Sequence, residues 1–199
     1  MQTCLKKPWE ALSITYCHLS QSDSDYLPCC PNICELKHLN LSALFICDFF
    51  LKPLGLLLER VRHSLQSLRL EWFRMEDPQF SALLPALGQG SQLTNIIICG
   101  NTLSLPVLKQ LLYHTAKLSQ ITQELYPAPL EYYNDVSTLL IDRFDQLCPE
   151  ILDTLRDKRQ PKRKHRQATS GYEASSACRE KYELKDQHVW SFKQERKTC

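Results

Sequence analysis

The sequence predicts an α/β fold assembled from short strand–helix repeats, and three features of the chain lead to this prediction. An apolar pattern of the form L-x-x-L-x-L returns at nearly constant spacing along the chain. Between successive copies, the apolar period changes from that of a strand to that of a helix. The 199 residues are 43% hydrophobic, which supplies enough apolar side chains for a core.

The repeated pattern occurs four times in good form and once more in degraded form. Its second apolar residue is, in chain order, Leu12, Leu39, Leu68, Ile96 and Ile121, at steps of 27, 29, 28 and 25 residues. In the fifth copy, Gln123 replaces the last apolar residue. This pattern is that of leucine-rich repeats, whose period is about 20–29 residues. We therefore expect about five short parallel strands within residues 1–128.

The segments between the strands carry the period of an amphipathic helix. Pro53, Pro78 and Pro106 stand near the expected helix starts, where a missing N–H costs little. The segment from Asp25 to Pro31 is rich in proline and cysteine and is only weakly helical in pattern. The apolar helix positions are Leu54, Leu57, Leu58, Val61 and Leu65, then Phe80, Leu83, Leu84 and Leu87, then Leu105, Leu108, Leu111 and Leu112.

One strand–helix unit cannot bury its apolar face alone, so stacked units should share a core. Strands lie about 4.8 Å apart, whereas packed helices need about 8–10 Å. The stack should therefore curve into a short solenoid, a horseshoe of the ribonuclease-inhibitor type with its strands on the concave side. The side chains between the strand leucines would then face a protein partner: Ser13, Thr15, Asn40, Ser42, Arg69, Glu71, Ile97 and Cys99.

Residues 129–157 are expected to close the stack as a capping helix. Pro127 and Pro129 interrupt the chain, and apolar residues then return at steps of three and four from Leu130 to Leu155. A terminal repeat needs a cap with a polar outer side. We expect no matching cap before the first repeat, so the leading face of that repeat should be bare.

The charge is divided unevenly, which suggests a body and a tail. Residues 1–155 carry a net charge of −5, and residues 156–199 carry +7. We expect residues 158–199 to be a disordered basic tail. Its compact basic run consists of Lys162, Arg163, Lys164, His165 and Arg166. This run fits a nuclear-import signal, a nonspecific nucleic-acid patch or simply a solvated tail, and nucleic-acid binding is the weakest of these readings.

The sequence offers little for catalysis, cofactors or membranes. Phosphate-binding glycine loops and the common hydrolase and metalloprotease motifs do not occur, so we expect neither enzymatic activity nor a cofactor. Cys30, Cys34 and His38 match only one side of a zinc site, and the alternative is that the cysteines are reduced apolar fillers. No apolar run approaches the length of a membrane span, and the first residues lack the apolar region of a signal peptide. We expect a cytoplasmic or nuclear protein without membrane contact.

Two helical segments contain L-x-x-L-L, the motif that docks into nuclear-receptor grooves. They begin at Leu54 and at Leu108. The same leucines belong to the stripe that should face the repeat core. We therefore expect them to be buried and unavailable for docking.

Several stretches resemble the C-terminal half of the PRAME family, the preferentially expressed antigen in melanoma and its relatives, which include the oogenesins. The stretches are Trp9-Glu-Ala-Leu-Ser-Ile-Thr-Tyr-Cys-His-Leu-Ser20, Leu83-Leu-Pro-Ala-Leu-Gly88, Ser91-Gln-Leu-Thr94 and Leu125-Tyr-Pro-Ala-Pro-Leu-Glu-Tyr132. The resemblance implies a leucine-rich-repeat horseshoe. For some members it also implies substrate recognition for a cullin-2 ubiquitin ligase and negative regulation of transcription, differentiation and apoptosis. The elongin- and cullin-binding box of longer members lies in an N-terminal region that precedes the part matched here.

Three hypotheses for the function remain open at this point. The first is a protein-binding module whose concave face grips a protein, such as a substrate for degradation. The second is a nuclear regulator that acts through its basic tail. The third is a truncated product whose bare first repeat promotes association.

Overall fold

The computed structural model describes residues 7–44 and 50–133, together with three strands between residues 165 and 196. Its element order is strand, helical segment, strand throughout the first part. The strands are β1 (Ala11–Ser13), β2 (His38–Asn40), β3 (Ser67–Arg69), β4 (Asn95–Ile97) and β5 (Gln123–Pro127). The helices are α1 (Gln21–Tyr26), α2 (Leu51–Val61), α3 (Asp77–Leu87) and α4 (Leu105–Ala116). These strands and helices confirm the predicted α/β class.

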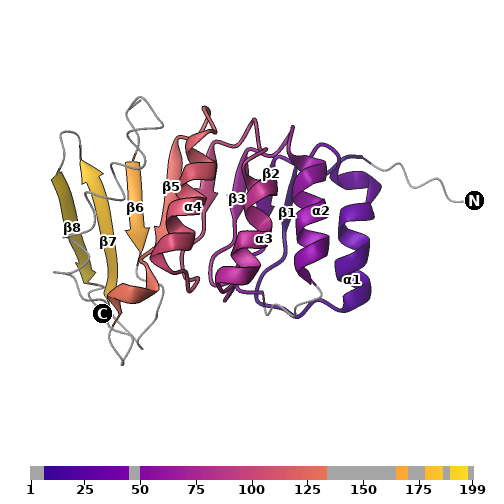
Figure 1. The fold of residues 1–199 in the computed structure, drawn as a ribbon. Helices are drawn as coiled ribbons and strands as arrows, with labels where there is room; N and C mark the ends of the chain where they lie inside the picture. Colours follow the sequence, from indigo (N-terminus) through magenta and orange to yellow (C-terminus); the bar gives the residue numbers. More distant parts are fainter. Residues whose placement is uncertain (1–6, 45–49, 134–164, 170–177, 186–188, 197–199) are drawn as a thin grey trace, which may run out of the picture.

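Strands β1 to β5 form a parallel sheet in the order of the sequence. The register aligns Leu12, Leu39, Leu68 and Ile96 as direct neighbours, so the first four copies of the pattern are placed as predicted. Helices α1 to α4 lie side by side in one layer against this sheet (Figure 1). The segment between β1 and β2 is the least regular, because its helix α1 has six residues and is followed by two short 3-10 helices, η1 (Leu27–Cys29) and η2 (Pro31–Ile33).

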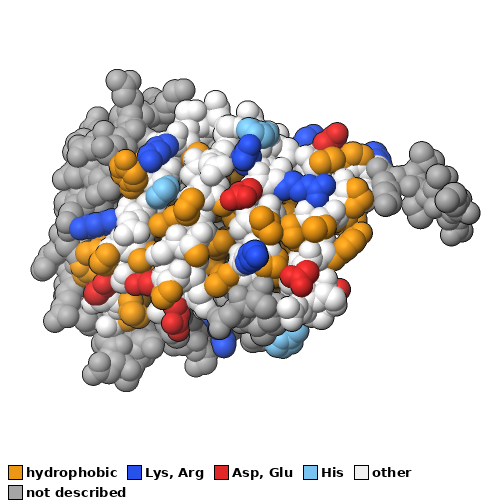
Figure 2. Space-filling view, turned by 45° about the vertical axis from the view of Figure 1, so that its right-hand side comes forward, with side chains coloured by type: hydrophobic (Ala, Val, Ile, Leu, Met, Phe, Trp, Pro, Cys, Tyr) orange, Lys and Arg blue, Asp and Glu red, His pale blue; other side chains and the backbone are white. Residues whose placement is uncertain are grey.

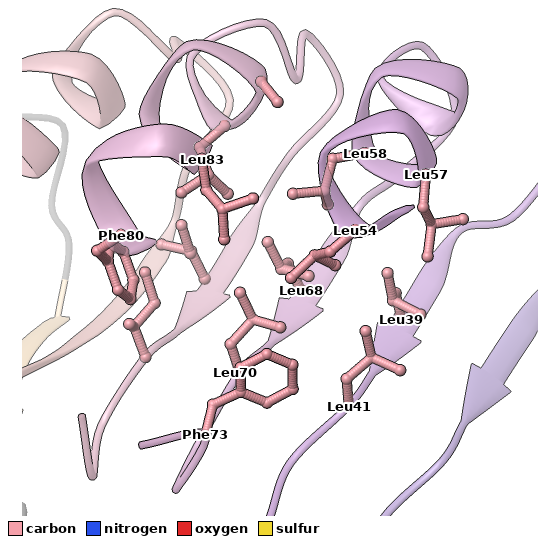
Figure 3. Close-up of a cluster of buried hydrophobic side chains, with 14 of the residues drawn as sticks. Leu39, Leu41, Leu54, Leu57, Leu58, Leu68, Leu70, Phe73, Phe80 and Leu83 are labelled. Carbon is pink, nitrogen blue, oxygen red and sulfur yellow. The ribbon is translucent and has the colours of Figure 1, made fainter. Parts of the chain in front are cut away.

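The core lies between the helix layer and the sheet. Leu39 and Leu68 point up from the strands, while Leu54, Leu57 and Leu83 point down from the helices into the same space (Figure 3). Leu39, Leu54, Leu57, Leu68 and Leu83 are all at most 1% exposed. At about 25 cal/mol per Å² of buried apolar surface, this shared layer is the main stabilising contribution to the fold.

The two L-x-x-L-L segments contribute to that core, as predicted. Leu54, Leu57 and Leu58 on α2 are at most 3% exposed, and so are Leu108, Leu111 and Leu112 on α4. A leucine stripe that already packs against strands cannot enter the groove of a partner while the helix stays folded. Docking of these motifs into a nuclear receptor would require local unfolding.

The fifth unit differs from the prediction in its register. The sheet pairs Ile96 with Glu124, not with Ile121, and pairs Ile97 with Leu125. The period is therefore 28 residues, and the fifth pattern reads Ile121, Glu124 and Tyr126. A search for apolar residues misses this alignment, because a carboxylate occupies the central buried position.

Glu124 is 1% exposed and shares a hydrogen-bonded group of side chains with Tyr126 and Thr115. The Tyr126 hydroxyl donates to Oε1 of Glu124 at 3.0 Å and lies 2.8 Å from the hydroxyl of Thr115 on α4. Buried polar groups need such partners, because an unmet hydrogen bond in the core costs about 1–3 kcal/mol. The row of aligned apolar residues at the strand centres thus ends at β4. Strand β5 contacts α4 through the polar side chains of Tyr126 and Thr115.

The turn after β5 is tied to the start of α4. The backbone N–H of Leu130 donates to the carbonyl of Leu103 at 2.7 Å. The Glu131 carboxylate accepts from the N–H of Leu105 at 2.9 and 3.0 Å. A negative charge at a helix N-terminus is favourable, since it complements the helix dipole and the free N–H groups. The turn Leu130–Tyr132 therefore links the end of β5 to the start of α4 through hydrogen bonds.

Two predictions about the C-terminal part need correction. The helix expected from residue 130 does not begin there, because Leu130–Tyr132 form a 3-10 turn, η4, and Tyr133 is extended; the rest of the predicted capping helix lies outside the described residues. The tail expected to be disordered contains β6 (His165–Thr169), β7 (Cys178–Lys185) and β8 (Val189–Arg196).

Backbone pairing accounts for these three tail strands. β6 pairs in parallel with β5, and β7 pairs antiparallel with β6 and β8. Tyr182 is opposite Phe192, and Leu184 is opposite Trp190. Tyrosine, phenylalanine and tryptophan favour strands in general, a signal in the sequence that the high charge of the tail concealed. The basic run is only partly described, with His165 and Arg166 as the first residues of β6.

One titratable group gives the body a pH dependence. His114 packs against Gly88, where an added Cβ would lie 2.9 Å from Nδ1 of the imidazole. Burial lowers the pKa of His114, and the positive charge of Lys117 lowers it further. The unfolded chain therefore binds a proton more readily than the folded chain does. The contribution of His114 to stability is complete above the ordinary pKa of histidine, about 6.5, and is lost as the pH falls below that value.

We accordingly expect the melting temperature to fall as the pH drops from 7.5 to 5.5, with a smaller fall in the His114→Gln variant. Carboxylates that titrate in the same range affect both proteins alike. Thermal unfolding followed by circular dichroism at several pH values measures the difference. The control is His63→Gln, which replaces an exposed histidine. If His114→Gln and wild type show the same pH dependence, His114 does not carry this effect.

Candidate protein-binding surface

The predicted contact residues fall into two rows on the sheet face away from the helices. Register places Ser13, Asn40, Arg69 and Ile97 in the first row. The second row, two residues further along each strand, holds Thr15, Ser42, Glu71 and Cys99. Backbone hydrogen bonds continue the strand pairing at this level, from the N–H of Ala43 to Glu71 and from the N–H of Trp72 to Cys99.

The structure brings several of these side chains into contact. Arg69 and Glu71 form an ion pair with 2.7 Å between the guanidinium Nη2 and the carboxylate Oε2. The Ser42 hydroxyl donates to the side-chain oxygen of Asn40 at 2.7 Å. The Cys99 thiol lies 3.8 Å from the other oxygen of Glu71. Glu71 thus contacts both Arg69, at the end of β3, and Cys99, two residues after the end of β4.

Fewer of the predicted contact residues are exposed than we expected for an open polar face. Ile97 and Cys99 are each 5% exposed, and Ser42 is 8% exposed. Asn40 covers Ser42 through their hydrogen bond, and Cys99 packs against Glu71. These three residues therefore cannot form a large direct contact with a partner. The accessible predicted residues are Ser13, Thr15, Asn40, Arg69 and Glu71, all on β1 to β3 or directly after them.

The prediction missed a third row on the same face, which lies two residues before the first row in each strand. This row contains Ala11, His38, Ser67, Asn95 and Gln123. The side-chain amide of Asn95 donates to Gln123 at 2.9 Å. A stricter use of strand alternation would have found these residues, because each immediately precedes the central residue of its strand that faces the core. The third row extends the polar face across all five strands.

The prediction also missed a row of residues with left-handed backbone conformation. Tyr16, Ala43, Trp72 and Gly100 have φ values of 55°, 55°, 55° and 75°. Each lies four residues after the central core-facing residue of its strand, which is Leu12, Leu39, Leu68 or Ile96. The repeat therefore imposes the same unusual backbone conformation at the same place in each unit. We call these four residues the aromatic rim.

Other chemistry is limited in the part of the chain that the structure describes. Within residues 7–44 and 50–133, three or more His, Cys, Asp or Glu side chains do not come together in a group able to hold a metal ion. Cys30 is buried, whereas Cys34 and His38 are exposed. Among the described helices, none has the length and apolar character needed to cross a bilayer. The face seen in Figure 2 mixes hydrophobic and charged side chains of both signs.

These observations define an α/β protein of repeated strand–helix units, with a parallel sheet whose helices α1 to α4 cover one face. The chain belongs to the PRAME family, since the model of the PRAME C-terminal domain matches residues 1–178. The resemblance seen in the sequence is therefore confirmed.

Relatives in two mammals show the same similarity. Over 160 residues, the chain is 55% identical to Oogenesin-2 of Mus musculus, covering 80% of this chain and 34% of the relative. Over 159 residues each, it is 56% identical to mouse Oogenesin-3 and 46% identical to PRAME family member 12 of Homo sapiens, covering 80% of this chain and 32% and 33% of the relatives. The chain thus spans about a third of the length of these relatives. No solved structure matches it.

Proposed function

We propose that this chain is a protein-interaction module and that a protein partner binds the sheet face left uncovered by α1 to α4. The observation that carries the proposal is the accessible set of polar side chains aligned on β1 to β3, with the Arg69–Glu71 ion pair at its centre. Arginine is enriched among residues that dominate binding energy at protein interfaces. The pair is also partly exposed, with 46% of the Arg69 side chain and 21% of the Glu71 side chain accessible.

The geometry of repeated units supports this use. Strand–helix units that stack along one axis create a continuous face from many short strands, and such faces bind macromolecules in repeat proteins. The regular 27- to 29-residue steps between aligned strand residues agree with leucine-rich repeats. We propose that the units form a short leucine-rich-repeat solenoid, with the candidate surface on its strand side.

Family membership suggests what the partner would be. By resemblance to PRAME relatives, we propose that the bound protein is a substrate presented to a cullin-2 ubiquitin ligase and that the consequence is negative regulation of transcription, differentiation and apoptosis. In this proposal, the present chain contributes substrate recognition. Contact with elongin and cullin-2 would come from the N-terminal region of longer members. Cytoplasmic or nuclear location and the absence of enzymatic activity stay predictions.

Reversing the charge of Arg69 tests the surface. In Arg69→Glu, the new carboxylate faces Glu71, so the centre of the face changes from a neutral pair to two negative charges. We expect the amount of each specific partner captured from cells to fall at least tenfold. One misplaced charge at the centre of an interface costs several kcal/mol of binding free energy. If the adaptor proposal is right, co-purification of the same partners with cullin-2 and elongin falls in parallel when the surface is placed in a longer family member.

Two controls separate recognition from folding. Lys52→Glu makes the same charge change on an exposed position of α2 and should leave capture unchanged. The double exchange of Arg69 to Glu and Glu71 to Arg rebuilds an ion pair with reversed orientation. If binding depends on the positions of these two charges, the double variant also fails to bind the partner, while its melting temperature matches that of the wild type. Equal capture by wild type and Arg69→Glu would rule out this face as the binding surface.

A further inference from the structure

The Arg69–Glu71 pair leaves one edge of the guanidinium unused. Nε and Nη2 of Arg69 both donate to Oε2 of Glu71, at 3.2 and 2.7 Å. A guanidinium carries five N–H groups in a planar fork, and these two bonds engage two of them. The others belong to Nη1 and to the outer side of Nη2, and they have no partner among the described residues. Since 46% of the Arg69 side chain is accessible, this edge is available to a partner.

The acceptors around this edge are already engaged within the sheet face. Oε1 of Glu71 accepts from the Cys99 thiol at 3.8 Å. Asn40 is the first-row neighbour of Arg69 on β2, and its Oδ1 accepts from the N–H and the hydroxyl of Ser42 at 3.1 and 2.7 Å. The side-chain amide of Asn40, in contrast, donates to no group in the described part of the chain. Arg69 and Asn40 therefore offer a partner donors and no free acceptor.

We propose that the protein partner places an aspartate or glutamate side chain on this face, bound by Nη1 and Nη2 of Arg69 and by the side-chain amide of Asn40. This proposal rests on the proposed function and states the chemistry of the partner at the centre of the surface. A carboxylate only accepts hydrogen bonds, and its two oxygens match the two nitrogens of a guanidinium edge. Such charge-assisted contacts are about twice as strong as hydrogen bonds between neutral groups.

The charges on the face favour this ligand over other charged groups. Among the residues of β1 to β5, Arg69 alone is a lysine or an arginine, and Glu71 lies beside it. A phosphate brings up to two negative charges against the Glu71 carboxylate, whereas an acidic side chain brings one. A cation of the partner would compete with Arg69 and Cys99 for the oxygens of Glu71. Ile97, the neighbour of Arg69 on β4, is apolar and 5% exposed, so it adds no competing polar group.

Synthetic peptides test the proposal on the full chain. The probe is an eight-residue peptide of alternating serine and glutamate, acetylated and amidated so that only side chains carry carboxylates. Its comparison peptides have glutamine in place of glutamate, either fully blocked, with a free C-terminal carboxylate, or with two phosphoserines. Isothermal titration measures the binding of each peptide to wild type and to Arg69→Gln. We expect saturable binding of the glutamate peptide, at least tenfold tighter than that of the blocked glutamine peptide and reduced at least tenfold in Arg69→Gln.

Variants of the two binding residues separate recognition from folding and from net charge. Arg69→Lys keeps the charge but loses the edge with two nitrogens, so the affinity for the glutamate peptide should fall about tenfold. Asn40→Asp keeps an oxygen for Ser42 and removes the donating amide. It should bind the peptide at least tenfold more weakly while the melting temperature stays that of the wild type. Lys52→Gln removes a positive charge from an exposed position of α2 and should change nothing.

The outcomes that would overturn the proposal are distinct. Equal binding of the glutamate peptide by wild type and Arg69→Gln would place that peptide elsewhere on the chain, such as on the basic tail. Tighter, Arg69-dependent binding of the phosphoserine or the free-carboxylate peptide would assign the edge to a phosphate or to a chain terminus. If the glutamate peptide fails to bind while Arg69→Glu still abolishes protein capture, the acidic ligand is wrong and the proposed function stands. If Arg69→Glu also leaves capture unchanged, neither survives.

Discussion

Replacing Phe73 by alanine is expected to lower the free energy of unfolding by about 3–5 kcal/mol. Phe73 is fully buried, and its ring centroid lies 6.0 Å from that of Phe50. In Figure 3 its side chain lies next to that of Leu70, at the lower end of the cluster of buried side chains. Truncation removes apolar contacts and leaves a cavity that the surrounding strands and helices cannot easily close. Urea unfolding followed by circular dichroism measures the loss.

The matched comparison for Phe73 is Leu56→Ala on α2. Leu56 is 48% exposed, so its truncation removes little buried surface and creates no cavity. We expect a change below about 1 kcal/mol for this variant. Similar losses for Phe73→Ala and Leu56→Ala would contradict the placement of the core between helices and sheet.

Replacing Asn101 by alanine is expected to destabilise the protein by about 3–5 kcal/mol, because three buried backbone groups lose their partners. The Asn101 side-chain oxygen accepts from the N–H of Met75 at 3.2 Å. Its amide donates to the carbonyls of Leu70 and Ile98 at 2.8 and 2.7 Å. The side chain thus joins the end of one repeat to the next. The same denaturation measurement records the effect.

Asn95 provides a control of the same residue type in the same unit. It is half-buried and its amide bonds a single partner, the side chain of Gln123 at 2.9 Å. Asn95→Ala should therefore cost about 1 kcal/mol or less. A loss for Asn101→Ala as small as that for Asn95→Ala would show that the three backbone groups find other partners.

Local patterns predicted most of the body correctly. The step from Leu39 to Leu68 and from Leu68 to Ile96 predicted aligned strands, because residues at one repeat position must bury the same face. The helical period around Leu57 and Leu111 likewise predicted buried faces. Both predictions depend only on side-chain direction in regular structure, which the sequence encodes locally.

The candidate surface was predicted less well, since exposure depends on neighbours in other units. Arg69 and Glu71 were placed correctly on the open face, but Ser42 and Cys99 are covered by side chains from that same face. The aromatic rim escaped notice because tyrosine and tryptophan are not typical of left-handed positions. Its row becomes visible only when the same backbone conformation is seen to recur in four units.

The sequence alone determined that this chain is a series of strand–helix units with leucines facing a common core, because periodicity and spacing are properties of the chain itself. Only the tertiary structure decided that Glu124 takes the buried position of the fifth strand. There the Tyr126 hydroxyl, itself hydrogen-bonded to Thr115, donates to Oε1 of Glu124. These three side chains come from different parts of the chain and meet only on folding, so their contact is not visible in the sequence.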